Sequence, residues 1–178
     1  MSLAIQDNIT KLQLGHAATD PHDLVSPIIV TSGEINEFMK MHVINLAERG
    51  LRQVGKRLYG AKIAVMGLAY KKNINDARES PAIKIIEELV NLGVDLRVYD
   101  PHVASLSTKA GLFTSASSAE EALAGADCAI FLVDHDEFRE ISTAMIRNLM
   151  ASPVIVDGKN LFSGGKGIIY LGIGKIYD

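Results

Sequence analysis

The sequence lacks several features that would assign the protein to a common class. It contains no tryptophan and few other aromatic residues, so a surface that stacks nucleic-acid bases is not expected. The single cysteine, Cys128, excludes an intramolecular disulfide and suits a reducing cytoplasm. A formal net charge of -3 gives no basic field for nucleic acid or membrane. No apolar run approaches the ~20 residues of a membrane span, and no signal peptide is recognised, so we expect a cytoplasmic protein.

What the sequence does contain, from Lys62 onward, is an alternation of short apolar runs and helical patterns. Five strands are predicted, at Ile63–Ala69, Asp95–Tyr99, Cys128–Val133, Val154–Val156 and Ile168–Leu171. Three helices are predicted between them, at Pro81–Leu92, Ser118–Ala124 and Phe138–Met150. Strands separated by helices of this length form βαβ units with right-handed crossovers. The predicted fold class for residues 61–178 is therefore α/β, a Rossmann-like three-layer parallel sheet.

Two segments precede this domain. Residues 1–30 have weak periodicity and several turn-forming residues, so we expect a loosely ordered segment. A long helix is predicted to start at Thr31–Glu34 and to continue past Gly50, and we assign residues 31–60 to it. Its apolar stripe consists of Ile35, Phe38, Met39, Val43 and Leu46. A complete sheet domain would leave this stripe uncovered, so we expect a second subunit or a missing domain to pack on it.

The segment Lys62–Pro81 carries the strongest functional signal in the chain. Its apolar strand is followed by Gly67, which permits a tight turn, and Ser80 is a good N-cap for the helix that Pro81 begins. Between them lies a polar loop that contains Tyr70, Lys71, Lys72, Asp76, Arg78 and Glu79. The carboxyl edge of a parallel sheet is where α/β proteins bind ligands. The sequence therefore predicts a binding site in this loop.

The residues of the loop allow more than one interpretation. A nicotinamide dinucleotide is the weaker one, because the turn after Gly67 lacks the further glycines that let a backbone approach a pyrophosphate, although Asp100 stands where a ribose-binding acid would. An anion site built from side chains is favoured, since the lysines offer ammonium groups and Arg78 offers a planar fork. The alternative without a ligand is that these charges are solvated and that Arg78 pairs with Asp76.

Several motifs together resemble the C-terminal domain of the UDP-glucose/GDP-mannose dehydrogenase family. They keep the family's order and spacing over residues 28–174, and the helix from Glu34 resembles the family's central dimerising helix. The motifs are Gly-x-Ala-[Phe/Tyr]-Lys from Gly67, Asp-x-Arg-Glu-Ser-Pro from Asp76, Tyr-Asp-Pro from Tyr99, Asp-His from Asp134, Asp-Gly-x-Asn from Asp157 and Gly-Ile-Gly from Gly172. The Tyr70-Lys71-Lys72 form is most similar to the branch that oxidises UDP-N-acetylhexosamines, the UDP-N-acetylmannosamine and UDP-N-acetylglucosamine dehydrogenases.

The resemblance implies the substrate-binding portion of an NAD-dependent 6-dehydrogenase that oxidises a UDP-sugar to a UDP-uronic acid in polysaccharide biosynthesis. It also implies a homodimer through helix 31–60. By the same resemblance, Tyr70 and Lys71 contact the nucleotide sugar, and Arg78 reaches toward NAD held by another domain. Lys159 stands where the family usually has an arginine that contacts the nucleotide sugar. Lysine keeps the charge there but lacks the bidentate fork.

The family's catalytic cysteine and its N-terminal NAD-binding domain have no counterpart in this sequence. Gly15-His16-Ala17 is a faint echo of the family's cysteine loop, with Ala17 at the cysteine position. Cys128 lies inside an apolar strand and is expected to be an inert buried thiol. No catalytic residue is therefore assigned, and we expect no dehydrogenase activity from this chain alone.

Two points stay open at this level. His135 is interpreted as a structural hydrogen-bonding residue, with proton transfer as the alternative. The chain as a whole is interpreted as part of an oxidoreductase, with a catalytically dead dimeric nucleotide-sugar-binding or regulatory module as the alternative. A free-standing NAD-binding domain is a third hypothesis, which depends only on the βαβ pattern and Asp100.

Overall fold

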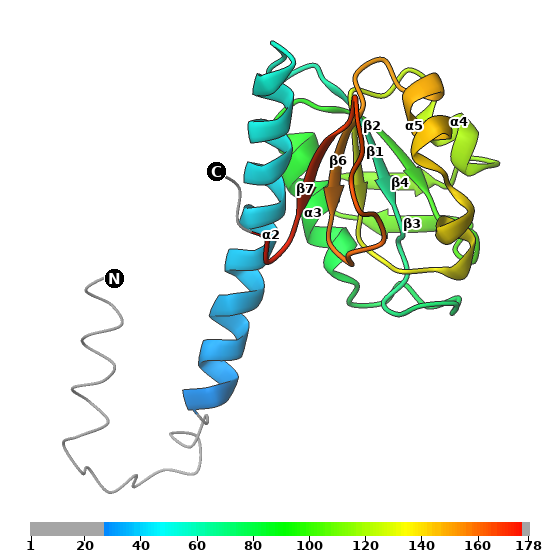
Figure 1. Cartoon of the computed structure of the whole chain (residues 1–178). Coiled ribbons are helices and arrows are strands. Elements are labelled where there is room, and N and C mark those ends of the chain that lie inside the picture. The colour runs from blue at the N-terminus through cyan, green and yellow to red at the C-terminus, as the bar shows by residue number, and fades with distance from the viewer. Residues whose placement is uncertain (1–26, 176–178) are drawn as a thin grey trace, which may run out of the picture. The chain divides into compact units, whose positions relative to one another are not determined.

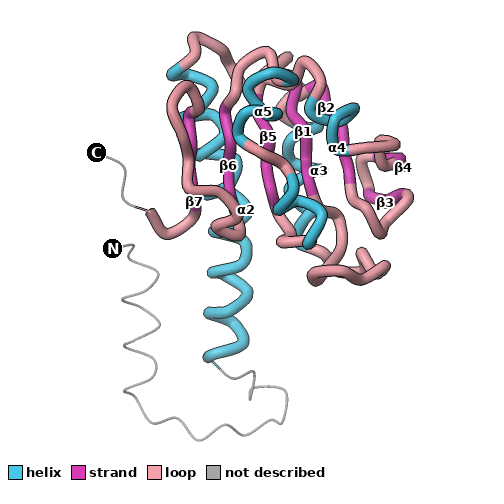
Figure 2. Tube along the Cα trace, turned by 45° about the vertical axis from the view of Figure 1, so that its right-hand side comes forward, coloured by secondary structure: helices cyan, strands magenta, loops and turns pink. Residues whose placement is uncertain are grey.

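The computed structural model describes residues 27–175, and its central feature is a five-stranded parallel sheet (Figure 1). The sheet consists of β1 (Lys62–Met66), β2 (Asp95–Tyr99), β5 (Cys128–Phe131), β6 (Val154–Asp157) and β7 (Ile169–Gly172). Their order is β2-β1-β5-β6-β7, and every neighbouring pair is parallel. Figure 2 shows the strands side by side in this order. The predicted fold class and all five predicted strands are confirmed, although β1 and β5 end earlier than predicted.

The sheet is covered on both faces, and its strands β1, β5 and β6 are almost wholly buried, as central parallel strands are. Residues of β1 alternate between two cores, with Ile63 and Val65 on one face and Ala64 and Met66 on the other. The first face packs against α2 (Pro27–Gln53) and α3 (Pro81–Asn91). The second packs against α4 (Ala119–Leu123), the 3₁₀ helix η2 (Asp136–Glu140) and α5 (Thr143–Leu149). This arrangement is the predicted three-layer architecture.

Several elements differ from the prediction for local reasons. The helix predicted at Phe138–Met150 is two elements, because Ser142 accepts a hydrogen bond from the Met145 amide and caps a new helix after η2. An antiparallel hairpin, β3 (Ser105–Thr108) with β4 (Gly111–Thr114), was not predicted. Its strands have only four residues each and mix polar with apolar residues, so they give no clear strand signal.

The long helix α2 begins at Pro27 and ends at Gln53, which differs from the predicted range 31–60. Proline is favoured at a first helical position, since its missing N–H would have no intrahelical partner. At the other end, Gly55 adopts a φ of 73°, and its amide donates to the Arg52 carbonyl. The predicted segment 1–30 and the Gly15–Ala17 motif lie outside the described residues, apart from residues 27–30.

Contacts divide the chain into Met1–Glu37 and Phe38–Asp178, and α2 runs across this division. In the second unit, the later part of the helix is buried in the sheet core through Val43, Ile44, Leu46, Ala47 and Leu51. The expectation that the apolar stripe has no partner in the chain is therefore wrong for this part. Earlier in the helix, Phe38 is 67% exposed and Met41 39% exposed. No helix among the described residues is both long and apolar enough to cross a membrane.

Candidate functional site

The loops that could form a site meet at the carboxyl edge of the sheet. From β1 the chain crosses to β2 on one side and later returns to β5 on the other, so the strand order reverses between β1 and β5. Ligands of open α/β sheets bind at this switch point. The loop after β1 carries Tyr70, Lys71 and Arg78, and the loop after β6 carries Lys159.

Gly67 starts the first loop at a position where a side chain does not fit. Its φ is 95°, and a Cβ there would lie 2.7 Å from the Cβ and 2.8 Å from the amide nitrogen of Val133. The Gly67 amide also donates to the carbonyl of Tyr99, the last residue of β2, over 2.8 Å, which continues the ladder one residue beyond the end of β1. Glycine is required here both for the backbone conformation and for the close approach of the segments that follow β1 and β5.

The fully buried carboxylate of Asp100 holds this edge together. Its Oδ2 accepts the amides of Leu68 and Ala69 over 2.6 and 2.9 Å, and lies 3.0 Å from Nε2 of His135. Its Oδ1 accepts the amides of His102 and Val103 over 2.8 and 3.0 Å. Asp100 therefore satisfies buried donors from the ends of three strands. Asp100 thus caps the turn after β2, and its buried side chain is not available to a ribose.

Burial by itself would raise the pKa of Asp100, but the hydrogen bonds from His135 and from the Ala69, Leu68 and His102 amides lower it to about 2. A lowered carboxyl pKa stabilises the fold above the unfolded-state pKa near 4, and this contribution is lost as the pH falls toward 2. The shift corresponds to ~2 kcal/mol.

Acid is therefore expected to reduce the free energy of unfolding by ~2 kcal/mol through Asp100 alone. Urea denaturation at about pH 5 and pH 2.5, in salt that screens exposed charges, measures the loss. An Asp100→Asn variant supplies the reference, because it should lack this component of the acid sensitivity. The same pH dependence in the variant and the wild type would contradict the assignment.

His135 joins this carboxylate to the loop after β1. Its side chain is fully buried, Nδ1 accepts the Asn73 amide over 2.9 Å, and Nε2 faces Asp100. Because an amide can only donate, Nδ1 carries no proton and the Nε2–H group donates to the carboxylate. Both ring nitrogens are engaged within the protein, so the structural interpretation of His135 is confirmed.

The two lysines of the loop have different environments. Lys72 pairs with Asp136 over 2.5 Å, and this hydrogen bond together with one from Asn73 lowers the pKa of Asp136. The Lys71 ammonium lies 5.8 Å from the centre of the Tyr70 ring, and no carboxylate pairs with it within residues 27–175. Tyr70 is 52% exposed. Lys71 and Tyr70 therefore form the part of the loop that can receive an anionic ligand.

Arg78 makes the ion pair that was considered for it without a ligand. Its Nε and Nη2 donate to the two oxygens of Asp76 over 3.0 and 2.8 Å. The side-chain and backbone hydrogen bonds from Arg78 lower the pKa of Asp76 to about 2. The Arg78 side chain is nevertheless 89% exposed, so its charge still faces solvent. The next residue, Glu79, adopts a φ of 58°, which is unusual for a residue other than glycine or asparagine.

Lys159 lies on a separate loop that a second buried aspartate organises. Asp157, at the end of β6, accepts the Lys159 amide on Oδ1 over 3.0 Å, and the Phe162 amide and the Tyr170 hydroxyl on Oδ2 over 2.9 Å. The Lys159 side chain is exposed. Since β6 is two strands from β1, about 10 Å separates these strands. Lys159 thus shares the sheet edge with Lys71 but belongs to a different loop.

The β1 turn does not fit a dinucleotide. A pyrophosphate at this position would need free amides at the turn, but the Leu68 and Ala69 amides already donate to the Asp100 carboxylate. The third hypothesis, an NAD-binding domain built on Asp100, is therefore not supported. Cys128 is fully buried, and burial raises the pKa of its thiol well above the usual range, so it is not a usable nucleophile.

Two features of this region were missed at the sequence level. Asn73 adopts a φ of 55°. Its Nδ2 donates to the Asp136 carboxylate over 2.6 Å, and its Oδ1 accepts the Asp136 amide over 3.2 Å. A polar asparagine in a tight loop was the available signal.

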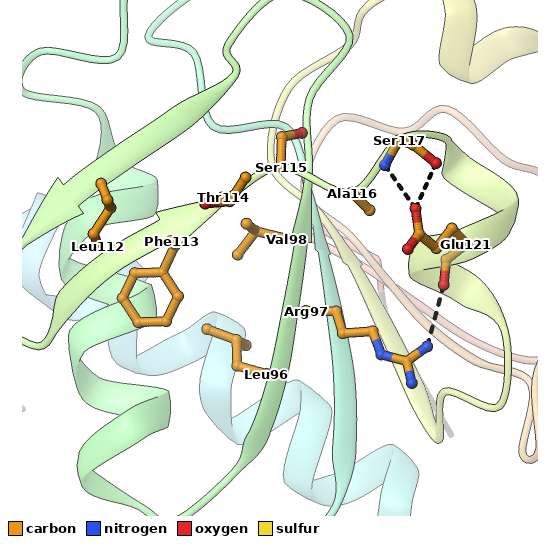
Figure 3. A pocket seen from close by; sticks show the side chains of 10 residues that line it. All are labelled: Leu96, Arg97, Val98, Leu112, Phe113, Thr114, Ser115, Ala116, Ser117 and Glu121. Carbon is orange, nitrogen blue, oxygen red and sulfur yellow. Dashed lines mark hydrogen bonds between the residues drawn. The ribbon is translucent and has the colours of Figure 1, made fainter.

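A cavity of about 590 Å³ also lies between the outer edge of β2 and the hairpin strand β4 (Figure 3). None of the predicted site residues lines it.

Comparisons with known proteins place most of this domain in a described family. A family model described as the UDP-binding domain of the UDP-glucose/GDP-mannose dehydrogenase family matches residues 64–164. UDP-glucose 6-dehydrogenase TuaD of Bacillus subtilis is 33% identical over 179 residues, covering 96% of this chain and 36% of TuaD.

Solved structures show the same partial coverage. A UDP-D-ManNAc dehydrogenase from Pyrococcus horikoshii superimposes with a TM-score of 0.72 and 34% identity, over 82% of this chain and 33% of that one. An NDP-N-acetyl-D-galactosaminuronic acid dehydrogenase from Methanosarcina mazei superimposes with a TM-score of 0.78 and 26% identity, over 96% of this chain and 36% of that one. The chain therefore spans about a third of the length of these relatives.

Proposed function

The chain belongs to the UDP-glucose/GDP-mannose dehydrogenase family, and we propose that its carboxyl sheet edge binds the UDP group of a nucleotide sugar for an NAD-dependent 6-dehydrogenase. The observation that carries this proposal is the environment of Lys71. Its ammonium has no carboxylate partner among the described residues, while the loop around it is fixed to three strand ends. An unpaired cation on an anchored loop is suited to a phosphate.

The proposed roles follow from where the side chains lie. Tyr70 and Lys71 contact the nucleotide sugar, and Lys159 adds a second positive charge from the loop after β6. Arg78 is held by Asp76 with its charge exposed, so it can face an anionic cofactor bound by another domain. In the proposed enzyme NAD accepts hydride, and the residues of this chain bind and orient the UDP-sugar that becomes a UDP-uronic acid.

Isothermal titration with UDP tests the binding site. Wild type is expected to bind UDP, and Lys71→Ala should weaken binding about 10- to 100-fold, because one charge-assisted contact contributes about 1.5–3 kcal/mol. Lys62→Ala is the matched control, since Lys62 is exposed at the opposite end of the same strand. NAD in the same experiment should give no binding, because the amides of the β1 turn are already occupied. Equal UDP affinity in wild type and Lys71→Ala would rule out this role.

We also propose that the chain forms a homodimer through the early part of α2. Phe38 is 67% exposed on this helix, and a large apolar side chain in that position favours association. Light scattering at tens of micromolar should give a dimeric mass for wild type and a monomeric mass for Phe38→Asp. Asn45→Asp, an exposed polar position on the same helix, should remain dimeric. A monomeric wild type would contradict the proposal.

A nucleotide-sugar-binding module without chemistry is the second candidate. It is favoured by the buried Cys128, which leaves the described residues without a reactive thiol. Both candidates require UDP binding. Formation of NADH from a UDP-sugar by a protein that contains this chain supports the dehydrogenase, and its absence from such a protein supports the module.

A further inference from the structure

The loop after β1 is attached to the neighbouring loops at a few defined points, and these points surround Tyr70 and Lys71 without involving the Lys71 ammonium. On one side, the Leu68 and Ala69 amides are bound by Asp100. On the other side, the Asn73 amide is bound by His135. Tyr70 and Lys71 therefore lie between two anchors, which are the amides of Leu68 and Ala69 bound by Asp100 and the amide of Asn73 bound by His135. Both anchors depend on Asp100, because His135 is itself hydrogen-bonded to it.

The second anchor is an oriented chain of hydrogen bonds. The Asn73 amide donates to Nδ1 of His135 over 2.9 Å, and the Nε2–H group donates to Asp100 Oδ2 over 3.0 Å. The His135 ring is fully buried and packs edge-on against Phe138, with 5.3 Å between ring centres, while the His102 ring lies 4.9 Å away. These contacts fix the His135 ring, and the ring in turn links Asn73 to Asp100. The loops at the ends of β1, β2 and β5 are therefore joined by one chain of hydrogen bonds.

The residue after His135 strengthens the same anchor from the surface. Asp136 accepts hydrogen bonds from Asn73 Nδ2 and from Lys72, and its own amide donates to Asn73 Oδ1. Asn73 is thus held by its backbone and its side chain in a left-handed conformation. Lys72 is used in this attachment, which leaves Lys71 for the ligand.

We propose that His135 is a positioning residue for the nucleotide-binding loop, which sets the place of Tyr70 and Lys71 by holding the Asn73 backbone to Asp100. This inference rests on the proposed function, since it takes UDP to bind at Lys71. It deepens that function by explaining how a loop without a dinucleotide-type glycine pattern acquires a defined conformation before ligand arrives.

Two substitutions separate the two hydrogen bonds of the ring. In His135→Asn, the amide oxygen can replace Nδ1 and keep the bond to the Asn73 amide, while the bond to Asp100 is lost. In His135→Gln, the longer amide can replace Nε2 and keep the bond to Asp100, while the bond to Asn73 is lost. We expect UDP affinity to fall about tenfold in His135→Gln and to stay within about threefold of wild type in His135→Asn, because one hydrogen bond of about 1.4 kcal/mol corresponds to a tenfold change.

A purely structural His135 predicts a different pattern, in which UDP affinity follows the melting temperature in both variants. That result would overturn the proposal. Nitrogen-15 shifts of the imidazole in the wild type provide a spectroscopic check, since they should show a proton on Nε2 and none on Nδ1. A proton on Nδ1 would also overturn it.

Asp136→Ala serves if neither histidine variant folds. Asp136 is exposed, so its removal should leave the melting temperature unchanged while it releases Asn73 and Lys72 and lowers UDP affinity about threefold. Glu140→Ala, exposed on the same 3₁₀ helix, is the control. Unchanged affinity in Asp136→Ala would count against the anchor.

Failure of the proposed function is distinguishable from failure of the positioning role. If wild type does not bind UDP, the proposed function fails, and amide hydrogen exchange at Asn73 then decides the positioning role alone. Protection that is lost in His135→Gln and retained in His135→Asn supports the role. Equal protection in the two variants overturns it.

Discussion

Replacement of Asp100 by alanine is expected to lower the free energy of unfolding by about 3–5 kcal/mol. The carboxylate accepts four backbone amides, from Leu68, Ala69, His102 and Val103, and a fifth hydrogen bond from His135. These donors are buried or partly buried, and each loses its partner when the side chain is removed. A buried donor without a partner costs about 1–3 kcal/mol, and relaxation or water entry recovers part of the sum.

Urea denaturation of Asp100→Ala and Asp100→Asn beside wild type measures this effect. Asparagine has nearly the same shape as aspartate, but its NH₂ group cannot accept and must face one of the two pairs of backbone amides. The Asp100→Asn protein should therefore be nearly as unstable as Asp100→Ala. Asp95→Asn is the matched control, because Asp95 is exposed at the other end of the same strand. The interpretation of Asp100 as the organising group would be wrong if its alanine variant unfolded within about 1 kcal/mol of wild type.

The sheet could be predicted from the sequence because its signals are local. Four of the five strands contain a short apolar run, and β2 alternates charged with apolar residues. The helix after β1 has both a serine cap and a proline at its first position, which the structure confirms at Ser80 and Pro81. Alternation of strands and helices then gives a parallel sheet, so the carboxyl edge and its loop follow without long-range information.

The division of roles inside the loop could not be predicted, because it depends on residues distant in sequence. The sequence does not distinguish Lys71 from Lys72. Only the ion pair of Lys72 with Asp136, which the loop after β5 supplies, shows that Lys72 is structural. Similarly, the Asp100 carboxylate occupies amides more than thirty residues earlier in the chain. In the sequence, only the missing glycines after Gly67 argue against a dinucleotide site. In the structure, the physical reason is that the Leu68 and Ala69 amides are already bound by Asp100.

The long helix shows the same limit. Val43 and Leu46 of the predicted apolar stripe are buried against the sheet, but the spacing of the stripe does not reveal what covers it. The part around Ala47 and Leu51 is buried in the core of the sheet domain, and the part around Phe38 is exposed. Periodicity identifies an amphipathic helix without distinguishing an internal partner from an external one.

Gly67→Ala is expected to destabilise the fold by about 3 kcal/mol or more and to weaken UDP binding at the proposed site. Two costs add at this position. A φ of 95° is unfavourable for alanine by about 1–2 kcal/mol, and the new Cβ would lie within 2.7–2.9 Å of three Val133 atoms, one of them the backbone nitrogen. Because backbone cannot move aside as a flexible side chain can, β1 and the segment after β5 must separate.

Gly55→Ala isolates the first of these costs. Gly55 has a φ of 73°, and nothing lies within 4 Å of an added Cβ, so this variant should lose only about 1–2 kcal/mol and bind UDP as wild type does. The difference between the two variants in urea denaturation then measures the contact with Val133. Since Gly67 leads directly into the loop that carries Lys71, that contact also fixes where the loop begins. A Gly67→Ala protein as stable as Gly55→Ala would show that the strand ends can separate freely, and the loop would then lack the rigid origin that a preformed phosphate site requires.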